Sequence, residues 1–224
     1  MSPTNDSLAR GRTRVKICGM TRVEDVRASA AAGADALGFV FVPKSKRALT
    51  IDAARDLFDA MPPFVQSVAL FLDPDAAWVQ SVIEELAPDL LQFHGNESGA
   101  FCRQFPRPYI KAAGTDWLSG GTERRWSDLI DDHPTARGFL LDSHETGALG
   151  GSGATFDWSH WPKGHDNDRQ PLILAGGLTA ANVASAISAV HPYGVDVSSG
   201  VEVSPGIKSA EKIQEFMSRV NHAE

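Results

Sequence analysis

Short apolar runs alternate with longer amphipathic stretches along the chain, and the alternation continues to the C-terminus. Apolar runs bounded by turn residues predict buried strands, and apolar residues at helical spacing predict helices. The predicted strands are 14–18, 36–42, 64–71, 90–93, 109–112, 138–141, 171–175 and 195–197. The predicted helices include 22–32, 51–60, 75–86, 182–190 and 208–220.

Local signals support several of these helices. Thr21, with Glu24 three residues later, predicts a capping box for the first helix, and Gly33 predicts its end. Thr50 predicts the cap of the second helix, and Asp73-Pro74 predicts the start of the third.

Eight strand–helix units predict a single α/β domain, the (β/α)8 TIM barrel, because helices that connect consecutive strands make those strands parallel. The fifth and sixth units are the weakest, since residues 116–132 are polar and rich in tryptophan, so an open sheet of six or seven strands is the alternative. Residues 1–13 are polar and predict a flexible N-terminal tail, and we expect residues 14–224 to form the barrel domain.

The composition narrows the class of protein. A hydrophobic fraction of 42% and a charged fraction of 22% in 224 residues are typical of a globular protein. The net charge of −7 argues against a nucleic-acid partner or an anionic membrane, but not against an anionic small molecule held by local donors. No apolar run is long enough to span a bilayer. Two cysteines cannot build a disulfide framework, and we therefore expect a cytoplasmic protein.

Metal and nucleotide cofactors have no support in the sequence. The seven histidines form no His-Glu-x-x-His or His-x-His motif and do not pair with the cysteines. The chain also contains no P-loop and no complete dinucleotide-binding fingerprint. We therefore expect neither a metal site nor a cofactor.

Polar residues gather where the predicted strands end. Cys18, His94 and Asp142 each follow or close an apolar run. Lys16 shares a strand face with Cys18, as Gln92 does with His94, because side chains alternate along a strand. Asp196 and Lys111 also interrupt apolar runs near strand ends. Barrels of this kind place their active sites at the C-terminal ends of the strands, so we expect the chemistry there.

Two glycine-bearing loops follow the last two predicted strands. Gly176-Gly177 follows the seventh strand, and Ser198-Ser199-Gly200 follows the eighth. Loops at these two places form the recurring phosphate site of the fold, and glycine lets backbone N–H groups approach a ligand. The alternative is that the glycines only close short turns. We favour a phosphorylated small molecule as the ligand.

For several candidate residues, a purely structural role is the alternative to a functional one. Cys18 is either a buried packing residue or a thiolate favoured by Lys16, whereas Cys102 is expected to pack in a helix. Arg47 either grips a carboxylate with its guanidinium or belongs to a solvated basic loop. Asp142 is either a turn residue before a linker or a site residue before a mobile loop, 143–153.

Taken together, these residues resemble the phosphoribosylanthranilate isomerase family of tryptophan biosynthesis, from about Val15 to the final helix. The motifs that carry the resemblance stand in order at compatible spacing: Val15-Lys16-Ile17-Cys18-Gly19-Met20-Thr21, Gly33-Ala34-Asp35-Ala36-Leu37-Gly38-Phe39-Val40-Phe41, Ser45-Lys46-Arg47, Gln92-Phe93-His94-Gly95, Leu141-Asp142, Gly150-Gly151-Ser152-Gly153, Phe156-Asp157-Trp158, Ala175-Gly176-Gly177-Leu178, Asp196-Val197-Ser198-Ser199-Gly200-Val201-Glu202 and Pro205-Gly206. Two departures concern packing and a connection: Phe93 stands where a smaller aliphatic residue is expected, and segment 163–170 is longer and more polar.

The resemblance implies a barrel that catalyses the Amadori rearrangement of N-(5-phosphoribosyl)anthranilate to 1-(2-carboxyphenylamino)-1-deoxyribulose 5-phosphate. It implies that Cys18 is the general base and Asp142 the general acid, that Arg47 holds the anthranilate carboxylate, and that the two glycine loops hold the phosphate. His94, Asp196 and Lys16 are expected to contact the substrate. For this chemistry we expect the pKa of Asp142 to be raised by burial and the pKa of Cys18 to be lowered by Lys16.

Two other functions remain open from the sequence. Another phosphate-binding barrel enzyme, of the sugar-phosphate epimerase or indole-glycerol-phosphate synthase type, would use lysine and glutamate at strand ends, for which Lys111 is the only good candidate. A non-catalytic sensor of a phosphorylated ligand would bind without turnover. No exposed apolar heptad or long apolar edge indicates a dimer, and we expect a monomer.

Overall fold

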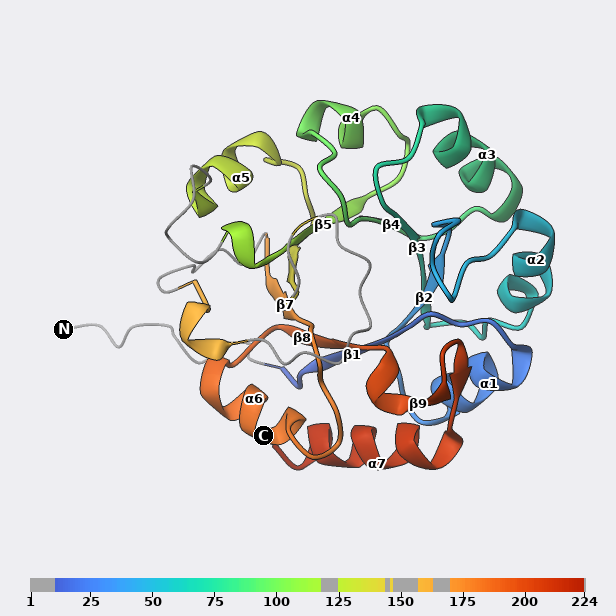
Figure 1. The fold of residues 1–224 in the computed structure, drawn as a ribbon. Helices are drawn as coiled ribbons and strands as arrows, with labels where there is room; N and C mark the ends of the chain where they lie inside the picture. The colour runs from blue at the N-terminus through green and yellow to red at the C-terminus, as the bar shows by residue number, and fades with distance from the viewer. Residues whose placement is uncertain (1–10, 118–124, 144–145, 147–156, 163–169, 224) are drawn as a thin grey trace.

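The structure is a computed structural model that describes residues 11–117, 125–143, 146, 157–162 and 170–223. Eight parallel strands form a closed barrel in which each strand pairs with the next and β8 pairs with β1 (Figure 1). The strands are β1 (Arg14–Cys18), β2 (Ala36–Val40), β3 (Gln66–Phe71), β4 (Leu90–Phe93), β5 (Tyr109–Ala113), β6 (Phe139–Leu141), β7 (Leu172–Leu174) and β8 (Gly194–Val197). The predicted barrel is therefore confirmed, and the open-sheet alternative is wrong.

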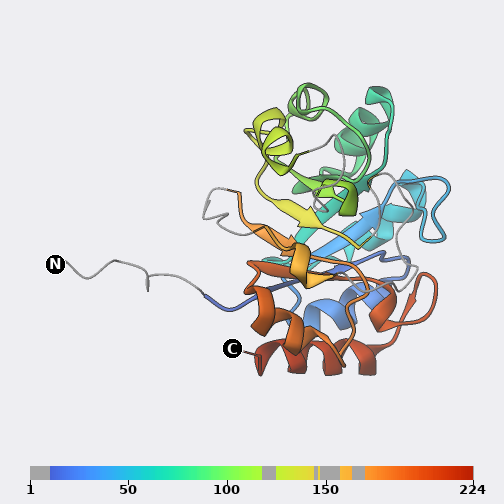
Figure 2. The ribbon, with the colours of Figure 1, turned by 60° about the vertical axis from the view of Figure 1, so that its left-hand side comes forward.

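Helices surround the strands as an outer layer (Figure 1). They are α1 (Val23–Ala31), α2 (Ile51–Asp59), α3 (Ala76–Leu86), α4 (Gly99–Arg103), α5 (Trp126–Asp132), α6 (Val183–Val190) and α7 (Ala210–Asn221), with short 3-10 turns η1 (Thr115–Trp117), η2 (Trp158–His160) and η3 (Ser199–Val201). Helix α7 packs against both α1 and α6 and so closes the helical layer, which Figure 2 shows from the side. Within the described residues, no helix has the length and apolar character needed to cross a membrane.

The units that gave the weakest sequence signal are the least regular in the structure. Helices α4 and α5 span only five and seven residues; the sequence predicted a helix around Cys102 without giving its bounds, and it did not predict α5. Their short length explains the missing signal, because one or two turns carry too few apolar positions for a clear helical period. Cys102 lies in α4 and is fully buried, as predicted.

Three predicted helix starts need correction. Thr21 does not cap α1, because the helix begins at Val23 and Arg22 stands at its N-cap position without a side-chain cap; the Thr21 hydroxyl donates to the carbonyl of Gly206. Helix α3 begins at Ala76 with Asp75 as its cap, since the Asp75 carboxylate accepts a hydrogen bond from the backbone N–H of Trp78 at 2.7 Å. The third correction concerns the last predicted helix, 208–220.

That helix starts two residues later than predicted, because Lys208 belongs to a strand. A small hairpin of β9 (Glu202–Ser204) and β10 (Ile207–Lys208) follows β8, and Ser209 then caps α7. The predicted ends hold elsewhere: Thr50 caps α2 through the N–H of Ala53, and Gly33 follows α1 with a φ of 93°.

The strand register fixes which side chains point into the barrel. Lys16 of β1 stands opposite Ala36 of β2 and Asp196 of β8, and Gln92 of β4 stands opposite Leu70 of β3 and Ile110 of β5. Small clusters of apolar side chains fill the interior of the barrel, and a larger core lies between the strands and the helices. Phe93 belongs to this outer core, where it packs against Phe71 and Phe105.

Two predictions concern residues that the structure describes only in part. The flexible tail 1–13 falls mainly on residues 1–10, and loop 143–153 is described only at Ser143 and Thr146. The polar segment 163–170 is described only at Gln170. All three lie largely outside the described residues.

Candidate active site

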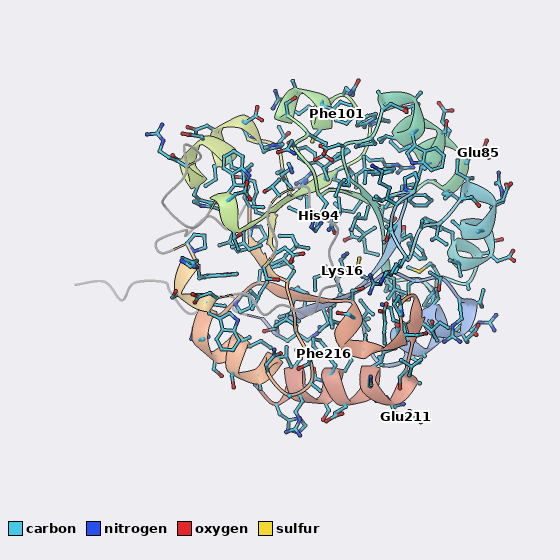
Figure 3. All side chains as sticks on the ribbon, viewed as in Figure 1. Lys16, Glu85, His94, Phe101, Glu211 and Phe216 are labelled. Carbon is cyan, nitrogen blue, oxygen red and sulfur yellow. The ribbon has the colours of Figure 1, made fainter. Side chains whose placement is uncertain are left out.

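A buried ion pair marks the middle of the barrel. The Lys16 ammonium lies 2.8 Å from an oxygen of Asp196, and the two residues stand directly opposite each other on β1 and β8. Burial works against the charge on Lys16, but the Asp196 carboxylate offsets this and raises the lysine pKa. Figure 3 shows Lys16 and His94 inside the ring of strands, whereas Glu85 and Glu211 lie on the outer helices. Lys16 and Asp196 therefore provide fixed charges beneath the mouth of the barrel.

Cys18 is the last residue of β1 and lies on the same face as Lys16, buried with 6% of its surface exposed. Burial raises the pKa of the Cys18 thiol, and the nearby charges of Lys16 and Lys208 offset this only in part. The prediction of a lowered pKa is therefore wrong. The pKa is raised because Cys18 lies at a strand end inside the barrel. This position is shielded from water, which disfavours the charged thiolate.

Asp142 and His94 come together across the barrel mouth. Asp142 follows β6 and is buried, and one of its oxygens lies 3.5 Å from Nε2 of His94, which follows β4. The side-chain nitrogen of Gln92 lies 3.1 Å from Nδ1 of the same ring. With the Gln92 amide nitrogen as the donor, Nδ1 accepts, and this assigns the ring proton to Nε2, which faces Asp142. A histidine N–H is thus directed at the carboxyl group.

The two glycine loops, after β7 and β8, lie side by side between Asp142 and Cys18. A β-carbon on Gly176 would lie 2.5 Å from the backbone nitrogen of Ser143, and one on Gly200 would clash with the carbonyl oxygen of Leu178. The loop after β7 therefore touches the residue after Asp142 on one side and the loop after β8 on the other. Gly176 and Gly177 have φ angles of 85° and 62°, a conformation that favours glycine.

The second loop connects back to Cys18. The carbonyl oxygens of Ser198 and Cys18 both accept hydrogen bonds from the Lys208 ammonium, at 3.2 and 2.6 Å. Ser199 begins the short turn η3, and Gly200 lies within it. Going around the barrel from β6 to β1, one meets Asp142, then the two glycine loops, then Cys18.

Arg47 is buried rather than solvated, so the alternative of an exposed basic loop is wrong. Its Nε and Nη2 donate to the two oxygens of Glu202, at 2.8 and 2.6 Å. The sequence alone indicates no role for Glu202 or Lys208. The signal that could have found them is the Pro205-Gly206 turn between them, which predicts a hairpin that brings the two side chains together.

Lys111 points away from the site. It stands opposite Phe93 of β4 and Phe139 of β6, which face the helices, and its ammonium donates to the carbonyl of Gly95 at 2.6 Å and pairs with Glu97 at 3.3 Å. The synthase-type alternative relied on Lys111 as a catalytic lysine at the barrel mouth. The structure places it on the opposite face of its strand.

Among the residues that the structure describes, no three histidine, cysteine, aspartate or glutamate side chains gather in a way that could hold a metal ion. The arrangement instead offers a thiol and a carboxyl group, separated by backbone N–H groups from two loops and flanked by buried cations. Such a set can move protons to and from a bound anionic ligand.

Comparisons with known proteins agree on one family. The family described as N-(5'phosphoribosyl)anthranilate (PRA) isomerase matches residues 15–219. An N-(5'-phosphoribosyl)anthranilate isomerase of Pseudomonas paraeruginosa is 49% identical over 211 residues, which cover 92% of this chain and 94% of the relative. One of Thiobacillus denitrificans is 50% identical over 210 residues, covering 92% and 97%.

Solved structures show the same likeness. The phosphoribosyl anthranilate isomerase of Thermotoga maritima has a TM-score of 0.81 and 39% identity, and the match covers 94% of this chain and 99% of that one. A second structure, solved in complex with reduced 1-(o-carboxyphenylamino)-1-deoxyribulose 5-phosphate, has a TM-score of 0.78 and 37% identity with the same coverage.

Proposed function

The chain belongs to the N-(5'-phosphoribosyl)anthranilate isomerase family, and we propose that Cys18 and Asp142 are the base and acid of its reaction. The protein is an isomerase of tryptophan biosynthesis that converts N-(5-phosphoribosyl)anthranilate into 1-(2-carboxyphenylamino)-1-deoxyribulose 5-phosphate by an Amadori rearrangement. Its substrate is a phosphorylated small molecule. The other barrel enzymes and the sensor are not favoured.

The proposed reaction needs only proton transfers. Asp142 delivers its proton to the furanose oxygen, the C1′–oxygen bond breaks, and the anthranilate nitrogen supplies the electron pair that forms a Schiff base at C1′. Cys18 then removes the proton from C2′, and that electron pair moves to give the enolamine. Tautomerisation of the enolamine to the ketone completes the isomerisation without any change in composition.

The raised pKa of Cys18 has a consequence for this step. A thiolate whose conjugate acid is weaker holds an abstracted proton more firmly, although less of the thiolate is present at neutral pH. Lys16 and Lys208 limit the penalty because both charges favour the thiolate. The Cys18 thiolate is therefore a strong base, but only a small fraction of the protein carries it at neutral pH.

The remaining candidate residues have proposed binding roles. The backbone of Gly176, Gly177 and the segment 198–200, with the side chains of Ser198 and Ser199, would hold the phosphate. Arg47 would bind the anthranilate carboxylate. Lys16, His94 and Asp196 would contact the ribose as it opens, since all three have side chains on the inner face near the acid and the base.

One observation supports these roles most strongly: the order Asp142, glycine loop, glycine loop, Cys18 around the barrel mouth, linked by direct contacts. A phosphate held by the two loops would extend its ribose between the acid and the base. The loss of substrate fluorescence on adding the purified protein tests the function. Steady consumption of substrate is expected, and binding without consumption would contradict it.

We also propose that the protein acts as a monomer in the cytoplasm. The two cysteines are both buried and unpaired, which suits a reducing compartment. The sequence offers no apolar heptad or long apolar edge for a partner. Light scattering at several protein concentrations tests the first point, and a mass near twice 24.0 kDa would contradict it.

A further inference from the structure

Glu202 lies at the centre of a buried ion cluster beside the site. It is the first residue of β9, and its Oε1 accepts from Nε of Arg47 at 2.8 Å and from Nζ of Lys208 at 2.7 Å. Its Oε2 accepts from Nη2 of Arg47 at 2.6 Å. The side chains of Glu202, Arg47 and Lys208 expose only 4%, 10% and 0% of their surface. The carboxylate is therefore shared between two buried cations.

The pairing of Glu202 with Arg47 is bidentate, and it therefore fixes the orientation of the guanidinium as well as its distance from the carboxylate. Two parallel hydrogen bonds to one carboxylate determine the plane of a guanidinium as well as its position. Arg47 comes from the loop after β2, outside any helix or strand, so its own backbone gives it little orientation. Glu202 supplies that orientation from the other end of the chain.

Arg47 also lies directly beside the base. A β-carbon on Gly19, the residue after Cys18, would clash with Cδ of Arg47 and lie 3.2 Å from its Nε. Gly19 has a φ of 86°, so both its conformation and its space require glycine. The guanidinium is thus held across the backbone that follows Cys18.

Part of the guanidinium is unused. Of its five N–H hydrogens, Glu202 takes one from Nε and one from Nη2. Within the described part of the chain, Nη1 of Arg47 donates to no other residue. Nη1 is not among the buried side-chain atoms that lack a partner, so it is open to solvent and can donate to a ligand that enters the site.

We propose that Glu202 is a positioning residue that holds the Arg47 guanidinium so that its free Nη1 edge binds the anthranilate carboxylate. This inference rests on the proposed function, in which Arg47 is the group that binds that carboxylate. Glu202 itself does not touch the substrate. It acts through Arg47 and decides which edge of the guanidinium remains for the ligand.

The charge of the cluster fits this role. Two cations and one carboxylate leave a net charge of +1 beside the site in a chain whose net charge is −7. Burial opposes ionisation of Glu202, but hydrogen bonds from Arg47 and Lys208 outweigh it and keep the glutamate pKa below its usual range. Glu202 thus orients Arg47 without cancelling the attraction for an anionic substrate.

Binding of two related compounds tests the inference. The first is reduced 1-(o-carboxyphenylamino)-1-deoxyribulose 5-phosphate, and the second is the same compound without the carboxyl group. The wild-type protein should bind the first more tightly, and Glu202→Gln should reduce that preference by about tenfold, as expected for one charge-assisted hydrogen bond. In an Arg47→Ala background, Glu202→Gln should change the preference no further.

Controls separate positioning from stability. Glu97→Gln removes a buried carboxylate paired with Lys111 on the outer side of the barrel, and it should lower the melting temperature but keep the preference. Glu202→Asp keeps the charge with a shorter reach and should lose part of the preference; it also serves if the amide variant does not fold. Full preference in a Glu202 variant that folds overturns the inference. Equal binding of both compounds by the wild type would instead contradict the proposed role of Arg47.

Discussion

Gly38 of β2 lies directly against Cys18 of β1. The two residues stand opposite each other in the parallel ladder, and a β-carbon on Gly38 would lie 2.7 Å from the sulfur and 3.1 Å from Cα of Cys18. No side chain fits at this position unless the thiol moves. The inner face of β2 is therefore shaped by the space that the proposed base needs.

This contact predicts the effect of Gly38→Ala. The added methyl group should displace the Cys18 thiol, and turnover should fall by about tenfold to a hundredfold, because a displacement of about 1 Å costs a catalytic group that much. Steady-state kinetics measures the change. Gly138→Ala is a matched control, since its β-carbon would lie 2.8 Å from the carbonyl of Pro171 at the opposite end of the barrel. It should lower stability and leave kcat unchanged; equal losses of kcat in both variants would contradict the prediction.

The thiol of Cys18 should react slowly with iodoacetamide at neutral pH. Burial raises its pKa above the usual 9.0, so the reactive thiolate forms in quantity only as the pH passes that value. The alkylation rate should still be rising above pH 9. Cys18→Ser should remove this reaction, because burial raises the pKa of Cys102 to about 12. A rate that levels off near pH 7 would show a lowered pKa instead.

Lys16→Met should raise the pKa of Cys18 further. Among the neighbouring charges, that of Lys16 has the largest effect in favour of the thiolate. The alkylation curve should shift to higher pH, and kcat/KM at neutral pH should fall by about tenfold or more. Because Asp196 would then be buried without its cation, Lys16→Met/Asp196→Asn is the control for stability. The double variant also removes the charge of Asp196, which raises the pKa of Cys18, so its curve should shift less than that of Lys16→Met. An unshifted alkylation curve in folded Lys16→Met would contradict the role of Lys16.

His133 should make the fold sensitive to acid. It is 1% exposed, and burial together with the charge of Lys111 lowers its pKa to about 4, from 6.5. Between these values the unfolded chain binds a proton that the folded chain does not, so stability falls as the pH drops from 6.5 to about 4. The loss is about 3 kcal/mol. Above pH 6.5 both states are neutral at this residue and the effect vanishes.

Urea unfolding at several pH values measures this dependence. His133→Gln should flatten the curve between pH 6.5 and 4, whatever its effect at neutral pH. His222→Gln, at an exposed position near the C-terminus, should leave the slope as it is. A slope that survives in His133→Gln would show that other groups cause the acid sensitivity.

The strands and the residues at their ends could be predicted because both follow from the order of apolar and polar residues in the sequence. Apolar runs mark the strands, and a polar residue at the end of such a run is costly unless it has a function, as with Asp142. The inward or outward direction of Lys111 could not be predicted this way. Parallel strands are covered on both faces, so hydrophobicity alone does not separate the inside of the barrel from the outside.

Two features of the site depend on distances that only the fold provides. The pKa of Cys18 is a balance between burial and nearby charges, and the sequence, which offered a buried residue and a thiolate favoured by Lys16 as alternatives, does not show which effect is larger. The cluster of Glu202 with Arg47 joins residues 155 positions apart. Each partner stood in a predicted motif, but their pairing follows from the closure of β8 onto β1 and from the β9–β10 hairpin.

The proposal that Cys18 and Asp142 move the protons of the reaction predicts a loss of turnover when either residue is replaced. Its most direct test is kcat of Cys18→Ala and Asp142→Asn at saturating substrate, followed by the loss of substrate fluorescence, with binding of the reduced product analogue measured on the same preparations. Both variants should bind the analogue, and each should lose about 10²-fold to 10⁴-fold in kcat. Near-normal kcat in either folded variant would contradict the claim for that residue.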